Sequence, residues 1–117
     1  MDARGALDIL DLTLLDHGAS ESSLDELCGL ANLHRPASVC VFSEHVPYVA
    51  ERLRGISISA VAAGFPVGGD NPEEVAAAIR QAVEAGADEI DCVLEPSEEA
   101  PGQAEQAMLI AMREATA

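Results

Sequence analysis

The amino-acid sequence predicts an α/β fold built on a parallel sheet of four strands. Four apolar runs of strand length alternate with stretches in which apolar residues recur at helical spacing. Short segments containing Gly, Pro or Asp separate these runs and stretches. Strands that alternate with helices through short connections are typical of right-handed βα units, in which neighbouring strands are parallel.

The first βα unit opens with the apolar run Leu7–Leu15, a predicted strand that carries Asp11. The turn Asp16-His17-Gly18 follows it. Ser20 is the predicted N-cap of a helix, with two nearby serines as alternatives, because a serine oxygen accepts hydrogen bonds from free N–H groups of the first turn. Arg35-Pro36 ends this helix. Its apolar stripe has i, i+3, i+4, i+7 spacing and consists of Leu24, Leu27, Cys28 and Ala31.

The second and third strands are predicted at Ala37–Phe42 and Ile56–Ala63. Between them lies a helix that Gly55 ends and whose first turn accommodates a proline. Its apolar stripe is formed by Val46, Val49, Ala50 and Leu53. The third strand leads into a glycine-rich loop at residues 64–70. Loops that follow parallel strands are where ligands bind in α/β folds, so this loop is a predicted part of any site.

The fourth unit starts with the strongest helix signal in the chain. Asn71 is a predicted N-cap, Pro72 suits the first helical position, and Glu73 and Glu74 suit the positive end of the helix dipole. Gly86 is a predicted helix stop, because glycine adopts the left-handed conformation without a Cβ clash. The apolar stripe of this helix is Val75, Ile79, Ala82 and Val83.

The fourth strand lies within Gly86–Leu94 and carries Asp91 in the middle of its apolar run. A buried carboxylate is costly unless it is paired or hydrogen-bonded. Two interpretations therefore stay open: Asp91 has a function, or it is a solvated acid near the end of the strand. A last helix is predicted at residues 102–115. Its segment Met108–Met112 is apolar almost all round, which is typical of a helix covered on more than one side.

Composition excludes several classes of function. The 117 residues include 21 acids and six arginines, with no lysine, for a net charge of −15. Nucleic acids and anionic membranes are disfavoured partners, because both require a basic face. A lysine Schiff base cannot be formed by these side chains. The acidic, lysine-free surface fits either a salty cytoplasm or an Ala- and Arg-rich coding bias, and we keep both explanations.

We expect a single domain at residues 1–117, located in the cytoplasm. The chain shows no secretory signal and no apolar run long enough to span a membrane. Its three cysteines have no CxxC spacing and are predicted to be reduced core residues. Its three histidines do not share metal-ligand spacing, so no metal site is predicted. We read His17, His34 and His45 as loop or helix-end residues.

Two architectures fit four βα units: a small doubly wound sheet, or one half of a (β/α)8 barrel. Several motifs favour the second. In chain order they are Ile9–Leu15, Leu27-Cys28, Val39–Val41, Gly64–Gly68 and Gly86–Asp91. Together these motifs resemble the N-terminal half of deoxyribose-phosphate aldolase, a class I aldolase with a TIM-barrel fold. The resemblance spans strands one to four with their helices.

The resemblance implies a site on these strands. Asp91 and Asp11 match the aspartates of strands four and one, so they are the candidate catalytic residues, and Asp91 matches the one that assists proton transfer. Cys40 matches a cysteine near the substrate, and we assign Cys40 and Thr13 to substrate binding. The family requires no cofactor. Its Schiff-base lysine and main phosphate-binding loops belong to later strands, which this chain lacks.

The chain also departs locally from the family pattern. A lysine often found after the first motif is Asp16 here, and the usual Asn-Pro after strand two is Phe42-Ser43. Without lysine, the family's covalent mechanism is excluded for this chain alone and for any homo-oligomer of it. Whether the chain is an enzyme therefore stays open at this point.

A half barrel leaves two parallel edges and an inner face without cover, which we expect to be largely apolar. The simplest completion is a homodimer whose two-fold axis pairs strand one of each copy with strand four of the other. Three functions follow. The chain is a self-assembling, aldolase-like half barrel that binds at most a small phosphorylated compound. Alternatively, it is a lyase or isomerase that uses Asp91 and Asp11 as acid and base. The third reading is a subunit completed by a second chain that carries the lysines.

Overall fold

The computed structural model describes residues 1–62, 71–93 and 103–116. The predicted loop at residues 64–70 and the end of the predicted fourth strand at Leu94 lie outside the described residues. The elements are, in chain order, α1 (Ala3–Leu7), β1 (Asp11–Leu14), α2 (Glu21–His34), β2 (Ser38–Phe42), the 3₁₀ helix η1 (Ser43–His45), α3 (Val46–Ala50), β3 (Ser57–Val61), α4 (Pro72–Ala85), β4 (Glu89–Asp91) and α5 (Gln103–Ala115).

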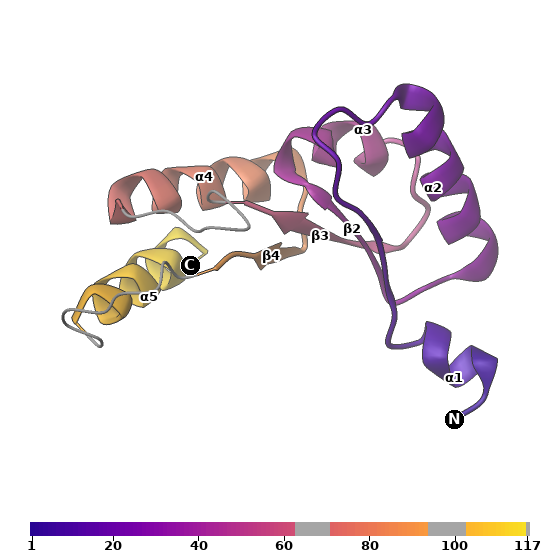
Figure 1. The fold of residues 1–117 in the computed structure, drawn as a ribbon, viewed down its shortest axis with the longest axis horizontal. Coiled ribbons are helices and arrows are strands. Elements are labelled where there is room, and N and C mark those ends of the chain that lie inside the picture. The colour runs from indigo at the N-terminus through magenta and orange to yellow at the C-terminus, as the bar shows by residue number, and fades with distance from the viewer. Residues whose placement is uncertain (63–70, 94–102, 117) are drawn as a thin grey trace.

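The four strands form one parallel sheet in the sequential order β1-β2-β3-β4, which confirms the predicted fold class. Figure 1 shows α2, α3 and α4 on one face of this sheet, α5 beside α4, and α1 below the start of β1. No described helix crosses the opposite face. A doubly wound sheet has helices on both faces and reverses its strand order at one point. The doubly wound alternative is therefore wrong.

The main core lies between the sheet and the helices that cover it. Alternate residues of each strand point into it, and the buried stripe of α2 packs against them. The strand residues in this core are Leu12, Leu14, Val39, Val41, Ile58, Ala60 and Ile90. A second cluster joins α4, α5 and β4 around Ile79, which is 1% exposed. Both clusters consist largely of small aliphatic side chains.

Three predicted helix ends, at Ser20, Asn71 and Gly86, are confirmed. The Ser20 oxygen accepts a hydrogen bond from the Ser23 N–H at 3.1 Å. The Asn71 oxygen accepts from the N–H groups of Glu73 and Glu74, at 2.9 and 3.4 Å. Gly86 ends α4 with φ of 116°, a left-handed conformation in which a Cβ would be strained.

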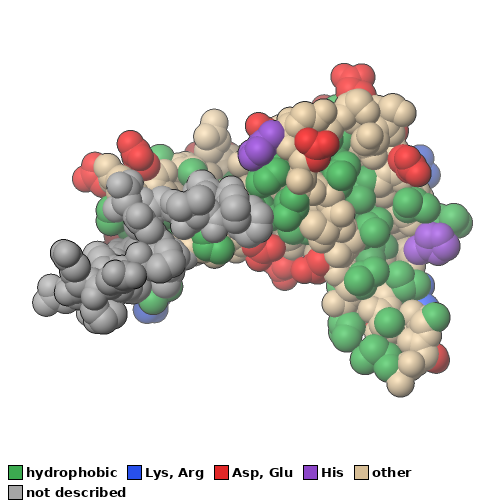
Figure 2. All heavy atoms as spheres, in the orientation of Figure 1, with side chains coloured by type: hydrophobic (Ala, Val, Ile, Leu, Met, Phe, Trp, Pro, Cys, Tyr) green, Lys and Arg blue, Asp and Glu red, His purple; other side chains and the backbone are tan. Residues whose placement is uncertain are grey.

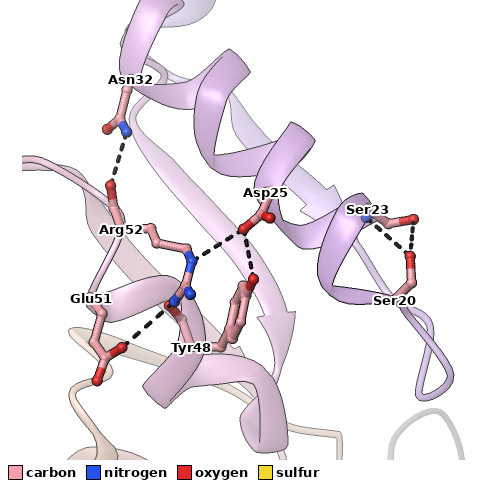
Figure 3. A network of polar contacts seen from close by, with 7 residues as sticks. All are labelled: Ser20, Ser23, Asp25, Asn32, Tyr48, Glu51 and Arg52. Atoms are coloured by element: carbon pink, nitrogen blue, oxygen red, sulfur yellow. Dashed lines mark hydrogen bonds and ion pairs between the residues drawn. The ribbon is translucent and has the colours of Figure 1, made fainter.

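A polar cluster fixes α2 against α3 (Figure 3). The Asp25 carboxylate accepts hydrogen bonds from the Tyr48 hydroxyl at 2.7 Å and from Arg52 Nε at 3.1 Å. The Asn32 amide donates to the Arg52 carbonyl at 2.9 Å, and its oxygen accepts from the Arg54 N–H, also at 2.9 Å. Asp25 and Asn32 therefore mark the side of α2 that faces α3.

The predicted start of the first strand is wrong. Residues Ala3–Leu7 form α1, and β1 begins only at Asp11. The Asp2 carboxylate caps α1 by accepting from the Gly5 N–H at 2.8 Å, and the Leu7 carbonyl accepts from the Ala37 N–H at 3.0 Å. The apolar run from Leu7 onward concealed this break, because apolar run length alone does not separate strand from helix.

Other boundaries also differ from the prediction. The helix expected over Val46–Leu53 ends at Ala50, after the short helix η1. The fourth strand covers only Glu89–Asp91, so Asp91 ends the strand and does not lie in its middle. On α5, Leu109 and Ile110 are 53% and 50% exposed, so this chain alone does not cover the helix as expected.

Candidate functional site

The candidate site is the sheet face that points away from the helices, here called the inner face. Side chains alternate between the two faces of a strand, so the residues between those of the main core point to it. The described inner-face residues are Asp11, Thr13, Ser38, Cys40, Phe42, Ser57, Ser59, Val61, Glu89 and Asp91. All four predicted site residues, Asp11, Thr13, Cys40 and Asp91, lie on this face.

The inner face is mostly polar, so the expectation of a largely apolar face is wrong. Polar side chains on it come from all four strands, and its apolar part is the small cluster Cys40, Phe42 and Val61. Figure 2 shows acidic side chains gathered below the sheet, in the same orientation as Figure 1. None of the described inner-face residues is basic. This face can therefore take part in polar and acid–base chemistry.

One row of hydrogen-bonded side chains spans the inner face from β1 to β4. The Ser38 hydroxyl donates to the Asp11 carboxylate at 2.6 Å. The Ser59 hydroxyl donates to the Glu89 carboxylate at 2.9 Å and lies 3.2 Å from the Ser38 oxygen. Ser38 and Ser59 are buried, whereas both carboxylates are exposed at the two edges of the sheet. The row thus places one acid at each open edge.

A second group lies nearer the carboxyl ends of the strands. The Cys40 thiol is 3.7 Å from the Asp91 carboxylate, with the thiol as donor. Burial raises the pKa of the Cys40 thiol to about 11, and the negative charge of Asp91 adds to the shift, while a hydrogen bond with Thr13 opposes it. Cys40 is therefore a protonated thiol at neutral pH. It can donate a hydrogen bond but is a poor nucleophile.

Asp91 lies at the end of β4 with its side chain on the inner face, a position that does not decide between the two interpretations. It is exposed and ends β4, as a solvated strand-end acid does, and its carbonyl accepts from the Ala62 N–H at 3.1 Å. Its carboxylate nevertheless points to Cys40 on the inner face. Its position is therefore that of an acid accessible to a ligand at the inner face.

Sequence reasoning missed Ser38, Ser59 and Glu89. Their signal was present as a period of two: polar residues recur at 11 and 13, 57 and 59, and 89 and 91. In a sheet with one covered face, such alternation indicates a polar second face. The apolar residues between them masked this alternation when each run was read as a buried strand.

The histidines lie in loops or at helix ends, as predicted. His17 stacks on Phe42 with ring centroids 3.7 Å apart, and its ring nitrogen contacts the Glu44 carboxylate. His45 Nε2 lies 3.0 Å from the Asp16 carbonyl oxygen. These contacts hold the segment after β1 against the end of β2. Among residues 1–62, 71–93 and 103–116, no group of three or more His, Cys, Asp or Glu is arranged to hold a metal ion.

Replacing Asp91 with asparagine is expected to increase the reactivity of Cys40. The substitution removes a negative charge beside the thiol, so the pKa of Cys40 moves down from about 11. We expect alkylation of Cys40 at pH 9 to accelerate about three- to tenfold, since one pKa unit changes the thiolate fraction about tenfold. Peptide mapping after iodoacetamide treatment measures this rate. Cys28, whose pKa Asp91 does not affect, is the internal control, and an unchanged Cys40 rate would contradict the contact.

The described helices include none that is long and apolar enough to cross a membrane. No protein-family model matches the chain. Individual relatives do match. The chain is 43% identical over 86 residues to deoxyribose-phosphate aldolase of Streptococcus uberis, a match that covers 73% of this chain and 39% of the relative. It is 36% identical over 86 residues to deoxyribose-phosphate aldolase of Clostridium tetani, covering 73% of this chain and 40% of the relative.

Solved structures agree with these relatives. A putative deoxyribose-phosphate aldolase from Coccidioides immitis superposes with a TM-score of 0.83 at 25% identity, over 99% of this chain and 47% of that one. A putative deoxyribose-phosphate aldolase from Toxoplasma gondii gives 0.82 at 22% identity, over 97% of this chain and 47% of that one, which supports the fold.

Four sequential parallel strands with helices on one face, matched to nearly half of a longer chain, define half of a TIM barrel. The chain is a relative of the deoxyribose-phosphate aldolases, which confirms the resemblance. It spans about two-fifths of the length of the curated relatives that it matches.

Proposed function

We propose that residues 1–117 are a single aldolase-type half-barrel domain that closes into an eight-stranded barrel with a second copy. β1 of each copy pairs with β4 of the other around a two-fold axis. The observation that carries the proposal is the sheet order: β1 and β4 are the two edges of a parallel sheet, and neither has a second described neighbour. Parallel edges invite pairing with another chain, and a closed barrel removes them.

The exposed side of α2 supports this pairing. Asp25 and Asn32 face α3, and the buried stripe faces the sheet. At 3.6 residues per turn, Leu30 lies on the opposite side from Asp25 and Asn32, toward the open edge at β1. It is 43% exposed. A neighbouring helix at that edge would cover it.

The exposed side of α5 has a matching position. Ala111 and Glu114 line a groove shared with α4, and Met112 contacts Cys92 beside β4, with the sulfur atoms 3.5 Å apart. Leu109 lies on the side of α5 away from α4 and is 53% exposed. Closing the barrel brings α5 of one copy beside α2 of the other, so Leu109 and Leu30 are the side chains that meet there.

Replacing Leu30 with glutamate is expected to weaken the dimer, because a charge would enter an apolar helix contact. We expect a loss of about tenfold or more in association constant, measured by sedimentation equilibrium. Leu33→Glu is the matched control, because Leu33 is 73% exposed and lies on the outer side of the same helix. Equal effects of the two substitutions would contradict the proposed contact.

We further propose roles for the inner-face residues by their match to the family. Asp91 and Asp11 are positioned for proton transfer, and Thr13 and Cys40 for contact with a small phosphorylated compound. Support comes from their shared location on one face and from the Cys40–Asp91 contact. Because the chain has no lysine, we propose that the homodimer carries out no Schiff-base chemistry.

A second candidate function is favoured by the charge of the inner face. Asp11, Glu89 and Asp91 lie on it with no described basic side chain beside them. A different chain that supplies the other four strands and the lysines would place positive charge opposite these acids and complete an aldolase site. Covalent trapping with borohydride separates the two candidates, because only a chain that carries lysines forms the adduct on a side chain.

A further inference from the structure

The proposed closure determines which side chains meet where the two copies join, and the following inference rests on that proposal. A (β/α)8 barrel has a shear of about eight residues. In a barrel made of two identical copies, each copy therefore contributes about four residues of this shear. Within one copy, Asp11 is opposite Ser38, Ser38 opposite Ser57, and Ser59 opposite Glu89. An offset of four residues at the junction, added to this register, places Asp11 of one copy opposite Asp91 of the other. Glu89 is then diagonally adjacent to Asp11.

Each of the two junctions would therefore gather three carboxylates on the inner face. In an antiparallel or parallel sheet, opposite side chains lie close enough to interact, and like charges at such positions are destabilising. Serine hydroxyl groups supply part of the hydrogen bonding that these carboxylates require: Ser38 donates to Asp11 and Ser59 donates to Glu89. Hydroxyl groups do not neutralise the charge.

Among the described residues, no ion pair joins Asp11, Glu89 or Asp91 to a basic side chain. His17, which stacks on Phe42 of the inner face, pairs with Glu44. On α1, Arg4 pairs with Asp8 at 3.5 Å and donates to the His34 carbonyl. On β2, the only titratable inner-face group is the Cys40 thiol. Just before β4, the Asp88 carboxylate accepts from the Ile58 N–H at 2.9 Å and is another acidic group. The described inner-face residues of β3 are not titratable.

We propose that this acidic junction makes barrel closure depend on protons and salt. Carboxylates brought into contact cannot all ionise at low cost, so some keep a proton. The closed dimer then binds more protons than two separate copies. By linkage, association strengthens as the pH falls and weakens as it rises. High salt screens the electrostatic repulsion between solvent-exposed carboxylates and therefore strengthens association as well. Closure is thus favoured in mildly acidic or saline solution.

The test compares Glu89→Gln with Glu84→Gln by sedimentation equilibrium between pH 5.5 and 8, in chelator-containing buffer at low and high salt. Both substitutions remove one negative charge, and Glu84 is exposed on α4, away from the junction. The glutamine oxygen at position 89 can still accept the Ser59 hydrogen bond. We expect Glu89→Gln to tighten the dimer about tenfold or more at pH 8 and low salt and to flatten its pH dependence. Glu84→Gln should change association less than about threefold.

Equal effects of the two substitutions would overturn the inference, because net charge alone would then explain the pH dependence. A dimer whose dissociation constant does not change with pH would overturn it while leaving the proposed closure intact. Absence of a dimer at every pH and salt concentration would overturn the closure itself. Asp11→Asn, which acts from the other side of the junction, provides a second variant with the same expected result. Far-UV circular dichroism checks that each variant is folded.

Discussion

Replacing Ile79 with alanine is expected to remove a large part of the stability of the folded chain. Ile79 is 1% exposed and joins α4 to α5 and β4 through Val75, Ala115 and Ile90. Truncating a buried isoleucine to alanine costs about 2–4 kcal/mol through lost burial and the cavity that remains. A small domain has a total stability of about 5–15 kcal/mol. The expected loss is therefore a substantial fraction of the free energy of unfolding.

Urea unfolding followed by circular dichroism measures this effect, at one protein concentration because association contributes to stability. Val83→Ala is the matched control, since Val83 is 44% exposed on the same helix. We expect its midpoint to stay close to that of the unaltered chain. If Ile79→Ala were equally mild, the cluster between α4, α5 and β4 would not be part of the stable core.

Borohydride treatment in the presence of deoxyribose phosphate is expected to leave the chain without a covalent adduct on any side chain. Reduction traps a Schiff base only where an amine has reacted, and the 117 residues contain no lysine. Intact-mass measurement and peptide mapping detect the adduct and distinguish it from reaction at the N-terminal amine. A side-chain adduct on the purified chain would contradict the proposed function.

The same experiment tests completion by a second chain. Adding a separately expressed C-terminal half of a deoxyribose-phosphate aldolase supplies lysines, and an adduct on that half alone, formed only in the mixture, would favour the second candidate. Asp91→Asn should then lower the trapping rate if Asp91 transfers the proton. Calorimetry with deoxyribose phosphate at high salt shows whether the homodimer binds a ligand without reacting, and the absence of heat would contradict that part of the proposal.

Much of the fold was predictable because local signals and tertiary structure agree. Ser20 and Asn71 cap the helices that they were predicted to cap, and Gly86 takes the left-handed conformation that ends α4. Such signals act within a few residues, so they are visible in the sequence alone. The first strand was mispredicted because α1 is fixed by contacts with the segment after α2, including the hydrogen bond from Ala37 to Leu7.

The candidate site was predictable only in part. The resemblance located Asp11, Thr13, Cys40 and Asp91 on their strands, and the structure places all four on one face. The serine hydroxyls that connect this face were not predicted, because Ser38 and Ser59 meet only through the register of β2 and β3. Register depends on pairing between distant segments, and no single run of sequence determines it.

The mass of the unaltered chain in solution tests the central proposal most directly. Light scattering after size exclusion, at low and high salt, distinguishes one copy from two. We predict twice the chain mass, with a dimer that strengthens at high salt, because salt screens the repulsion between two chains that each carry a net charge of −15. A monomer at every salt concentration would contradict closure by self-pairing and would mean that the chain covers the edges of its sheet in another way.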